Sequence, residues 1–198
     1  MFVIFRYLCN AFYYEEMMSD KVFFVREERP EDHEAVARVV EFAFRDMAES
    51  DHDEHRLVGR LRRSEAFVPQ LSLVAETNEG EIIGHILMTK VRIVSAEKSF
   101  VSLGLAPVSV LPAWQRRGVG SLLIHEAHRR AAALGFSSAV LLGHKDYYPR
   151  FGYRPASIFG ISFPFDAPGE CCMAVELLPG GLKGVSGTVE YDKAFFGE

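Results

Sequence analysis

The stretch Gln115-Arg116-Arg117-Gly118-Val119-Gly120 combines glycines and arginines at a spacing that could bind an anion. Apolar side chains recur at helical spacing over Ser121–Leu134, so we expect a helix to begin here. The first turn of a helix holds backbone N–H groups without a partner in the helix, at the positive end of the helix dipole. Glycine has no Cβ to hold a phosphate away from the backbone, and the arginines add positive charge. The stretch therefore predicts a phosphate-binding site, with an ordinary strand–turn–helix junction as the alternative.

A second unusual stretch, Gly143-His144-Lys145-Asp146-Tyr147-Tyr148-Pro149-Arg150-Phe151-Gly152-Tyr153, follows about thirty residues later. Its glycine and proline residues predict a loop and a short helical turn that ends at Gly152. It holds an imidazole and a carboxylate, which are side chains that act as general bases in enzymes.

Apolar patterns predict the elements that position these two stretches. We expect strands at Val22–Val25, Leu71–Glu76, Glu81–Val94, Leu103–Leu111, Ser138–Leu142, Ile158–Pro164 and Cys171–Leu177. We expect helices from Pro30, over Glu54–Arg63 and over Ser121–Leu134. A helix between the strands at 103–111 and 138–142 implies that these two strands are parallel neighbours. The glycine-rich tail Leu178–Glu198 is expected to lie over the domain surface.

The composition is typical of a folded globular protein. Of the 198 residues, 48% are hydrophobic and 25% are charged, and the formal net charge of −5 offers no basic footprint for nucleic acid. The three cysteines, Cys9, Cys171 and Cys172, form neither a disulfide framework nor a metal-ligand spacing. We therefore expect reduced thiols in the cytoplasm and no metal.

The first twenty residues form an aromatic-rich N-terminal extension, and residues 21–198 are expected to form a single domain. Arg6 and Asn10 interrupt the apolar run of the extension, which therefore fits neither a signal peptide nor a membrane-spanning helix. Two interpretations remain: translation starts at Met17 or Met18, or the segment packs on the domain or on a partner subunit.

The two motifs, in this order, make the chain similar to the GNAT (GCN5-related) N-acetyltransferases. Residues 115–120 fit the Gln/Arg-x-x-Gly-x-Gly/Ala loop of that family, and Tyr148–Tyr153 fits its Tyr-x-x-x-Gly-Phe/Tyr element. The resemblance covers roughly residues 22–177, and the string GHKDYYPRFGYRPA resembles a branch whose substrates are mostly unassigned. It implies an α/β fold: a central mixed sheet, flanked by helices, whose two parallel central strands splay apart.

The resemblance also implies that acetyl-CoA binds where these strands separate. Pantetheine would hydrogen-bond to exposed main chain as an added strand does, and a main-chain N–H near Val110 would polarise the thioester carbonyl. The pyrophosphate would lie on the N–H groups at the start of the helix. The cofactor-binding residues implied are Val108, Ser109, Val110, Gln115, Arg116, Arg117, Gly118, Val119, Gly120 and Ser121.

In the family, the position of Tyr148 is the usual candidate for protonating the departing thiolate. A phenol with a pKa of about 10 is a weaker acid than a thiol with a pKa of about 8.5, so a hydrogen bond to the thiolate is the safer description. The alternative is that Tyr148 only packs over the cofactor, which is the role that we expect for Tyr147.

The general base is harder to assign. The predicted strand from Leu103 carries no titratable side chain at its centre, whereas His144 follows the end of the next strand and titrates in the right pH range. An equally good interpretation is that His144 fixes its turn. Other candidates are Glu76, His85 and Asp146, of which Glu76 and His85 are better explained by structural roles, and we expect His125 and His128 to be solvated.

The sequence thus predicts an acetyl-CoA-dependent N-acetyltransferase. No cysteine stands beside the motifs to carry an acyl group, so we expect the amine to attack directly in a ternary complex. The alternatives are a non-catalytic acetyl-CoA-binding sensor or scaffold, and an enzyme acting on a protein amine. We expect a small-molecule amine as acceptor, no nucleic-acid or membrane partner, and a monomer or homodimer.

Overall fold

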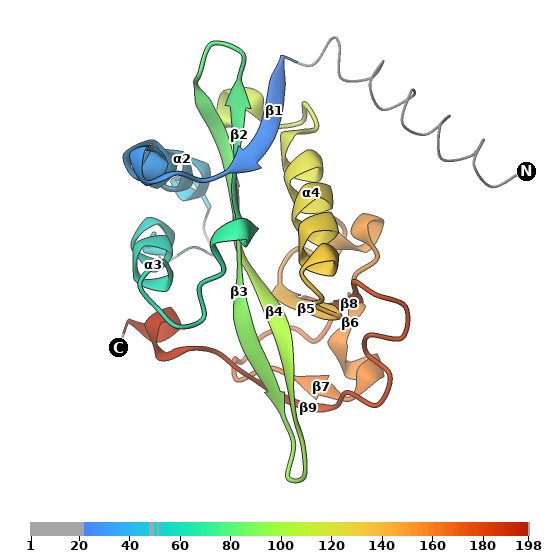
Figure 1. Cartoon of the computed structure of the whole chain (residues 1–198). Helices are drawn as coiled ribbons and strands as arrows, with labels where there is room; N and C mark the ends of the chain where they lie inside the picture. The colour runs from blue at the N-terminus through green and yellow to red at the C-terminus, as the bar shows by residue number, and fades with distance from the viewer. Residues whose placement is uncertain (1–21, 48–49, 51, 198) are drawn as a thin grey trace, which may run out of the picture.

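The computed structural model describes residues 22–47, 50 and 52–197. The expected N-terminal extension, residues 1–20, lies outside the described residues. Figure 1 shows a central sheet with helices on both sides.

In the part of the chain that the structure describes, the sheet contains nine strands, and most neighbours are antiparallel. Its main order is β1 (Phe23–Glu27), β2 (Ser72–Thr77), β3 (Ile82–Val94), β4 (Ser99–Val110), β5 (Ser138–Leu142), β8 (Cys172–Glu176) and β6 (Arg154–Pro155). Off this path, β9 (Gly187–Glu190) pairs with β3 and with β7 (Ile161–Ser162). The pair β4–β5 is parallel, as the crossover helix between them requires.

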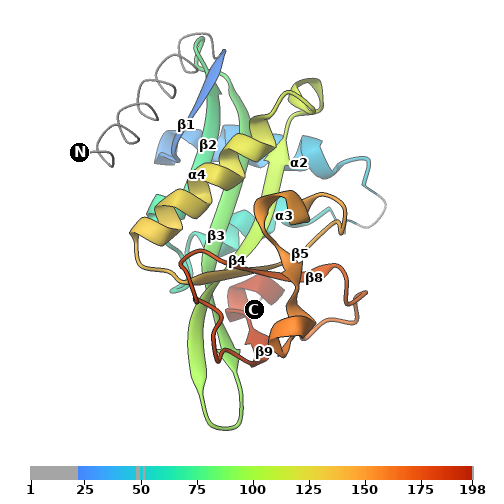
Figure 2. The ribbon, with the colours of Figure 1, turned by 90° about the vertical axis from the view of Figure 1, so that its right-hand side faces the viewer.

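Within the described residues, three α-helices cover the sheet: α2 (His33–Phe44) and α3 (Glu54–Leu61) on one face, and α4 (Val119–Ala133) on the other (Figures 1 and 2). A glycine lets α4 approach closely, because a Cβ at Gly84 on β3 would lie 3.0 Å from side-chain atoms of Leu123 and Val119. Both of these α4 residues are buried in the largest apolar cluster, and this packing fixes where the helix begins.

The parallel pair β4–β5 is short, and this opens the sheet. The two strands are in register only at Leu103 with Ala139 and at Gly104 with Val140. Beyond this point β4 continues to Val110 with no β5 partner. The register of β4 against β3 also shifts between Ile86 and Met88, a β-bulge that bends the strand. The predicted splaying of the two parallel central strands is confirmed.

Three expectations about the elements need correction. The helix expected from Pro30 begins as a 3₁₀ turn, Pro30–Asp32, before α2. The strand expected at 158–164 is shorter than predicted. A 3₁₀ turn, Ala156–Phe159, precedes it, Gly160 turns the chain with a φ of +72°, and only the two residues of β7 pair.

The third correction concerns the tail, which is more than a surface covering. Its residues 187–190 form β9, and Val189 is fully buried beside Ile93 of β3. A single apolar residue in a glycine-rich segment gives no period from which to predict a strand.

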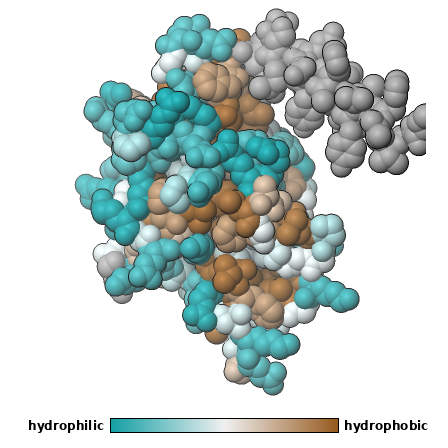
Figure 3. All heavy atoms as spheres, in the orientation of Figure 1, coloured by the Kyte–Doolittle hydropathy of each residue, from teal (hydrophilic) through white to brown (hydrophobic). Residues whose placement is uncertain are grey.

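Figure 3 shows hydrophilic side chains over the upper part of one face and hydrophobic ones around its middle. In the described part of the chain, no helix is both long and apolar enough to cross a membrane.

Candidate active site

A cavity of about 680 Å³ lies where β4 loses its partner strand and α4 begins. Its walls come from the end of α2, the end of β4, the start of α4 and the turn after β5. The lining residues are Ala43, Phe44, Met47, Val108, Val110, Trp114, Gln115, Arg116, Gly118, Val119, Gly120, Ser121, Tyr147, Tyr148 and Arg150.

The start of α4 presents free backbone donors to this cavity. Gly118 is its N-cap and has a left-handed φ of +86°, which glycine adopts without strain. The first N–H that bonds back is that of Leu122, which donates to the Gly118 carbonyl at 2.9 Å. The N–H groups of Val119, Gly120 and Ser121 precede it and have no acceptor within the helix. This arrangement suits a phosphate.

The structure brings most of the predicted cofactor-binding residues together. Eight of the ten line the cavity: Val108, Val110, Gln115, Arg116, Gly118, Val119, Gly120 and Ser121. The other two are Ser109, which is buried within the sheet, and Arg117, whose guanidinium lies over the ring of Trp114, 5.2 Å from its centroid. Gln115 also holds the loop to the strand, because its Nε2 donates to the Val110 carbonyl at 3.2 Å.

A second cavity of about 480 Å³ adjoins the first. It lies between β4 and the C-terminal segment, with α3 at one side. Its lining residues are Phe44, Met47, Glu54, Leu57, Leu105, Ala106, Pro107, Val108, Leu142, Gly143, His144, Tyr147, Tyr148, Phe165, Tyr191 and Phe195. Five residues line both cavities: Phe44, Met47, Val108, Tyr147 and Tyr148.

Tyr148 stands at the junction of the two cavities. A Cβ at Gly143 would overlap its ring, so this glycine makes room for the phenol. The ring also packs edge-on against Tyr147, at 5.2 Å between centroids, and against Tyr153, at 5.7 Å. Burial raises the pKa of Tyr148 above its ordinary value of 10, so the hydroxyl stays protonated and can donate a hydrogen bond.

His144 lies at the mouth of the second cavity. Its side chain is exposed, and its Nδ1 accepts from the N–H of Asp146 at 3.3 Å. Because Nδ1 accepts this bond, the neutral ring carries its hydrogen on Nε2, which is directed outward as a donor. His144 therefore lines the second cavity and also makes a contact within its own turn.

The other candidate bases lie outside both cavities. Glu76 pairs with Arg26, and His85 is fully buried beside Ser72, with 3.2 Å between Nε2 and Oγ. Asp146 is exposed and lines neither cavity. Among the residues that the structure describes, no group of three or more His, Cys, Asp or Glu side chains could hold a metal ion.

Comparison with known proteins agrees with this geometry. The family model described as "Acetyltransferase (GNAT) domain" matches residues 69–155, which include β4, α4 and β5. A solved GNAT family acetyltransferase from Brucella melitensis, in complex with acetyl-CoA, is 36% identical and has a TM-score of 0.71. The alignment covers 87% of this chain and 97% of that one. The chain belongs to the GNAT acetyltransferase family.

Two Escherichia coli proteins of this GNAT family are also similar. YjhQ, named an uncharacterized N-acetyltransferase, is 37% identical over 59% of this chain, and the match covers 65% of YjhQ, just under two thirds of its length. The structure of YhbS in complex with CoA is 26% identical with a TM-score of 0.76, and the alignment covers 88% of this chain and 92% of that one.

One expectation about histidines is wrong. His128 is half-buried on α4, and its Nε2 lies 3.1 Å from the hydroxyl of the buried Tyr153. Burial, together with the neighbouring His125, lowers the pKa of His128 to about 4. The helical face that looked polar in sequence is covered by the turn after β5, whereas His125 is exposed as expected, with its ring against Phe151.

Sequence reasoning missed several residues of this GNAT site. Arg150 lines the first cavity, donates to the Tyr147 carbonyl at 3.0 Å and is a second cation there. Its place inside the Tyr148–Tyr153 motif was a signal that could have found it. Glu54, Phe165, Tyr191 and Phe195 belong to segments with no such motif.

Proposed function

We propose that this protein is an N-acetyltransferase that transfers the acetyl group of acetyl-CoA to an amine. The observation that carries the proposal is the junction of the two cavities. One cavity offers the free N–H groups of α4 to an anion, the other is open to a second molecule, and Tyr148 lies between them. Two partners bound in this way would meet beside a fixed hydrogen-bond donor.

The residues around the first cavity fit CoA. The N–H groups of Val119, Gly120 and Ser121, with Arg116 and Arg150 nearby, suit its phosphates. The free edge of β4 over 108–110 suits the amide groups of pantetheine, which would extend the sheet. The complexes of the YhbS protein with CoA and of the Brucella melitensis protein with acetyl-CoA support this proposal.

Acetyl-CoA would supply an activated acetyl thioester. We propose that the neutral amine attacks its carbonyl carbon, that the C–S bond breaks, and that the amide and the free thiol of CoA are the products. The Tyr148 hydroxyl would donate a hydrogen bond to the sulfur as negative charge forms on it. His144 would accept the proton that the amine gives up at Nδ1, in place of its bond from the Asp146 N–H, and solvent would supply the proton of the thiol product.

We further propose a small-molecule acceptor, direct attack within a ternary complex, and a cytoplasmic location. A cavity of about 480 Å³ falls in the size range of small-ligand sites. The described cysteines, Cys171 and Cys172, line neither cavity, so neither is placed to carry an acyl group.

A CoA-binding sensor without turnover is the second candidate. It is favoured by the exposure of His144, whose side chain is 73% accessible, because an effective base is usually held more firmly. A protein amine as acceptor is a further alternative.

The first experiment measures thermal stability with CoA and with NAD. A hundredfold excess of CoA over its dissociation constant should stabilise the fold by about 2.7 kcal/mol, and NAD should not. An equal shift with NAD, or none with CoA, would contradict the proposed cofactor.

The second experiment measures thiol release from acetyl-CoA across a panel of amines. Turnover of any amine at a rate well above hydrolysis supports the enzyme. Tight binding of acetyl-CoA with no turnover across the panel would favour the sensor.

A further inference from the structure

The second cavity has an unusual wall. Six of its sixteen lining residues are aromatic, and they come from distant parts of the chain: Phe44, Tyr147, Tyr148, Phe165, Tyr191 and Phe195. Seven more are aliphatic side chains, methionine or proline: Met47, Leu57, Leu105, Ala106, Pro107, Val108 and Leu142. A molecule in this cavity would therefore lie mostly against apolar surface.

The aromatic residues of the C-terminal segment are packed into a fixed surface. Tyr191 and Phe195 lie 4.5 Å apart between ring centroids at an interplanar angle of 36°. Phe165 joins them at 5.3 Å from Tyr191 and 6.2 Å from Phe195. The 3₁₀ turn that carries Phe195 is tied to α3, because Arg60 Nε donates to the Ala194 carbonyl at 3.0 Å. Because these side chains are already held in place, ligand binding costs little of their conformational entropy.

The charge of the cavity is also distinctive. Among the described residues, Glu54 is the one carboxylate that lines this cavity, and no lysine or arginine lines it. Glu54 is half-buried in the first turn of α3, and its Oε1 accepts a hydrogen bond from Ser50 Oγ. A single negative charge beside an aromatic wall favours a cation with an apolar body, because aromatic faces attract cations as well.

We infer that the acceptor is a small primary amine with an aromatic or branched apolar body, and that Glu54 binds its ammonium group on entry. This inference rests on the proposed acetyltransferase function and names its substrate class. Sugars and polyamines fit poorly, because their several polar groups would be buried against hydrocarbon with few partners. An acidic amine would meet Glu54 with no cation among the described lining residues to offset the repulsion.

The direct test compares amines of similar size on the unmodified protein with saturating acetyl-CoA. 2-Phenylethylamine and isopentylamine represent the apolar class, and putrescine, glucosamine and the side chain of Nα-acetyl-lysine amide represent the polar class. We expect kcat/KM to be at least about tenfold higher for the apolar amines, the discrimination typical of one or two buried carbons.

Two outcomes of this comparison separate the inference from the proposed function. Polar amines acetylated as well as apolar ones would overturn the substrate class and leave the enzyme in place. No turnover of any amine, with CoA still bound, would overturn the proposed function and the inference with it.

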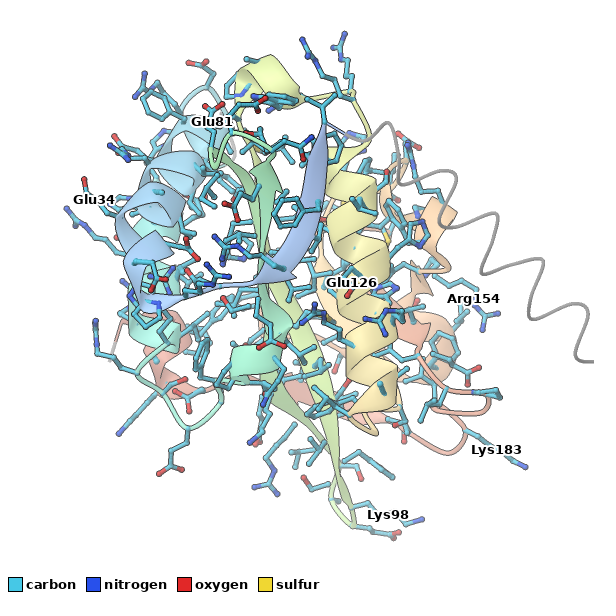
Figure 4. The ribbon with its side chains drawn as sticks, turned by 45° about the horizontal axis from the view of Figure 1, so that its top comes forward. Glu34, Glu81, Lys98, Glu126, Arg154 and Lys183 are labelled. Atoms are coloured by element: carbon cyan, nitrogen blue, oxygen red, sulfur yellow. The ribbon has the colours of Figure 1, made fainter. Side chains whose placement is uncertain are left out.

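Glu54→Gln tests the role of the carboxylate, and Glu34→Gln is a matched control. Both glutamates stand in the first turn of a helix, but Glu34 on α2 points outward into solvent (Figure 4) and lines neither cavity. Glu54→Gln should raise the KM for 2-phenylethylamine about tenfold with kcat and CoA binding little changed, and Glu34→Gln should change neither. Equal KM values for the two variants would overturn the role of Glu54.

Phe195→Leu tests the aromatic wall, with Phe196→Leu as its control. Phe196 belongs to the same turn and the same aromatic cluster, but it is 54% exposed and lines neither cavity. Phe195→Leu should reduce the preference for 2-phenylethylamine over putrescine several-fold, whereas Phe196→Leu should preserve it. An unchanged preference in Phe195→Leu would overturn the wall as the source of selectivity. If either variant fails to fold, the amine comparison on the unmodified protein still decides the substrate class.

Discussion

At the scale of single residues, the proposed chemistry depends on one phenol with fixed surroundings. Tyr148 lines both cavities, and its position depends on Gly143 as well as on the neighbouring rings. Its raised pKa makes full proton transfer to a thiolate still less favourable than for a free phenol. The role that remains is a hydrogen bond that strengthens as charge forms on sulfur.

Tyr148→Phe keeps the ring and removes one donor. We expect kcat to fall about ten- to a hundredfold, the loss of one hydrogen bond to a group that becomes charged, while CoA affinity changes little. Tyr147→Phe is the matched control, because this neighbouring phenol also lines both cavities but its hydroxyl faces Gly120 at the start of α4. Steady-state kinetics and calorimetry measure the two effects. A Tyr148→Phe protein with full turnover would show that the residue only packs.

Gly120 tests the phosphate-binding loop. A Cβ at this position would lie 3.0 Å from the Tyr147 hydroxyl and project into the first cavity. Gly120→Val should weaken CoA binding tenfold or more, which is about 1.4 kcal/mol, with the fold retained. A side chain at Gly169 meets no atom within 4 Å, so Gly169→Ala should bind CoA normally in the same calorimetric titration. Normal binding by Gly120→Val would place the phosphate elsewhere.

At the scale of elements, the site is made by a strand that loses its partner. The strands β4 and β5 pair at two positions and then diverge, so the end of β4 keeps an open edge. The helix α4 begins beside that edge because it packs on β3 at Gly84. The position of the phosphate-binding turn therefore depends on contact between α4 and the sheet.

Gly84→Val should test this dependence. The new side chain would press on Leu123, on Val119 and on the Ser109 carbonyl, which lies 3.2 Å from the Cβ position. Overpacking of this kind typically costs about 1–3 kcal/mol of unfolding free energy. We also expect weaker CoA binding, because Val119 is the first residue of α4. Urea unfolding measures the loss of stability, and calorimetry measures CoA affinity. Wild-type CoA affinity in a destabilised variant would show that the packing of α4 on β3 does not determine the phosphate site.

At the scale of the whole molecule, a buried cluster of polar side chains joins β1, α3, β2 and β3. Glu28, just after β1, pairs with Arg62 at the end of α3, and it also accepts from Ser72 Oγ. The Ser72 hydroxyl donates its one hydrogen to Glu28, so it accepts a hydrogen bond from His85 Nε2. The His85 ring is therefore neutral, with its hydrogen on Nε2 and none on Nδ1. The Nδ1 atom has no partner among the described residues.

The histidine of this cluster makes the free energy of unfolding depend on pH. Burial lowers the pKa of His85 to about 4 from 6.5; Glu28 opposes the shift, and Arg62 and His33 add to it. Between these two pH values the unfolded chain binds a proton that the native protein does not, so the free energy of unfolding decreases as pH falls. The full effect is up to about 3 kcal/mol, and His128 acts in the same direction.

His85→Gln should therefore flatten the pH dependence. The variant loses stability at pH 7, where His85 donates to Ser72, but its unfolding free energy should fall less between pH 7 and pH 5 than that of the wild type. His144→Gln changes an exposed histidine and should keep the wild-type slope. Denaturant unfolding at each pH measures the slopes, and identical slopes for His85→Gln and the wild type would contradict the titration of His85.

The sequence by itself determined the elements around the first cavity of this protein. An apolar strand, a proline, two glycines and an amphipathic helix are local signals, and they predicted β4, α4, β5 and most of the first cavity. The pair of motifs also predicted the family, which the comparisons confirmed.

Only the tertiary structure decided the second cavity and the burial of His85 and His128. The cavity joins Glu54, Phe165 and Phe195, whose segments meet because β9 adds to the sheet and the last turn binds α3. Contacts between residues so far apart in sequence leave no local period. A polar helical face also has the same sequence pattern whether it is solvated or covered by another segment, so the burial of His128 follows only from the position of that segment.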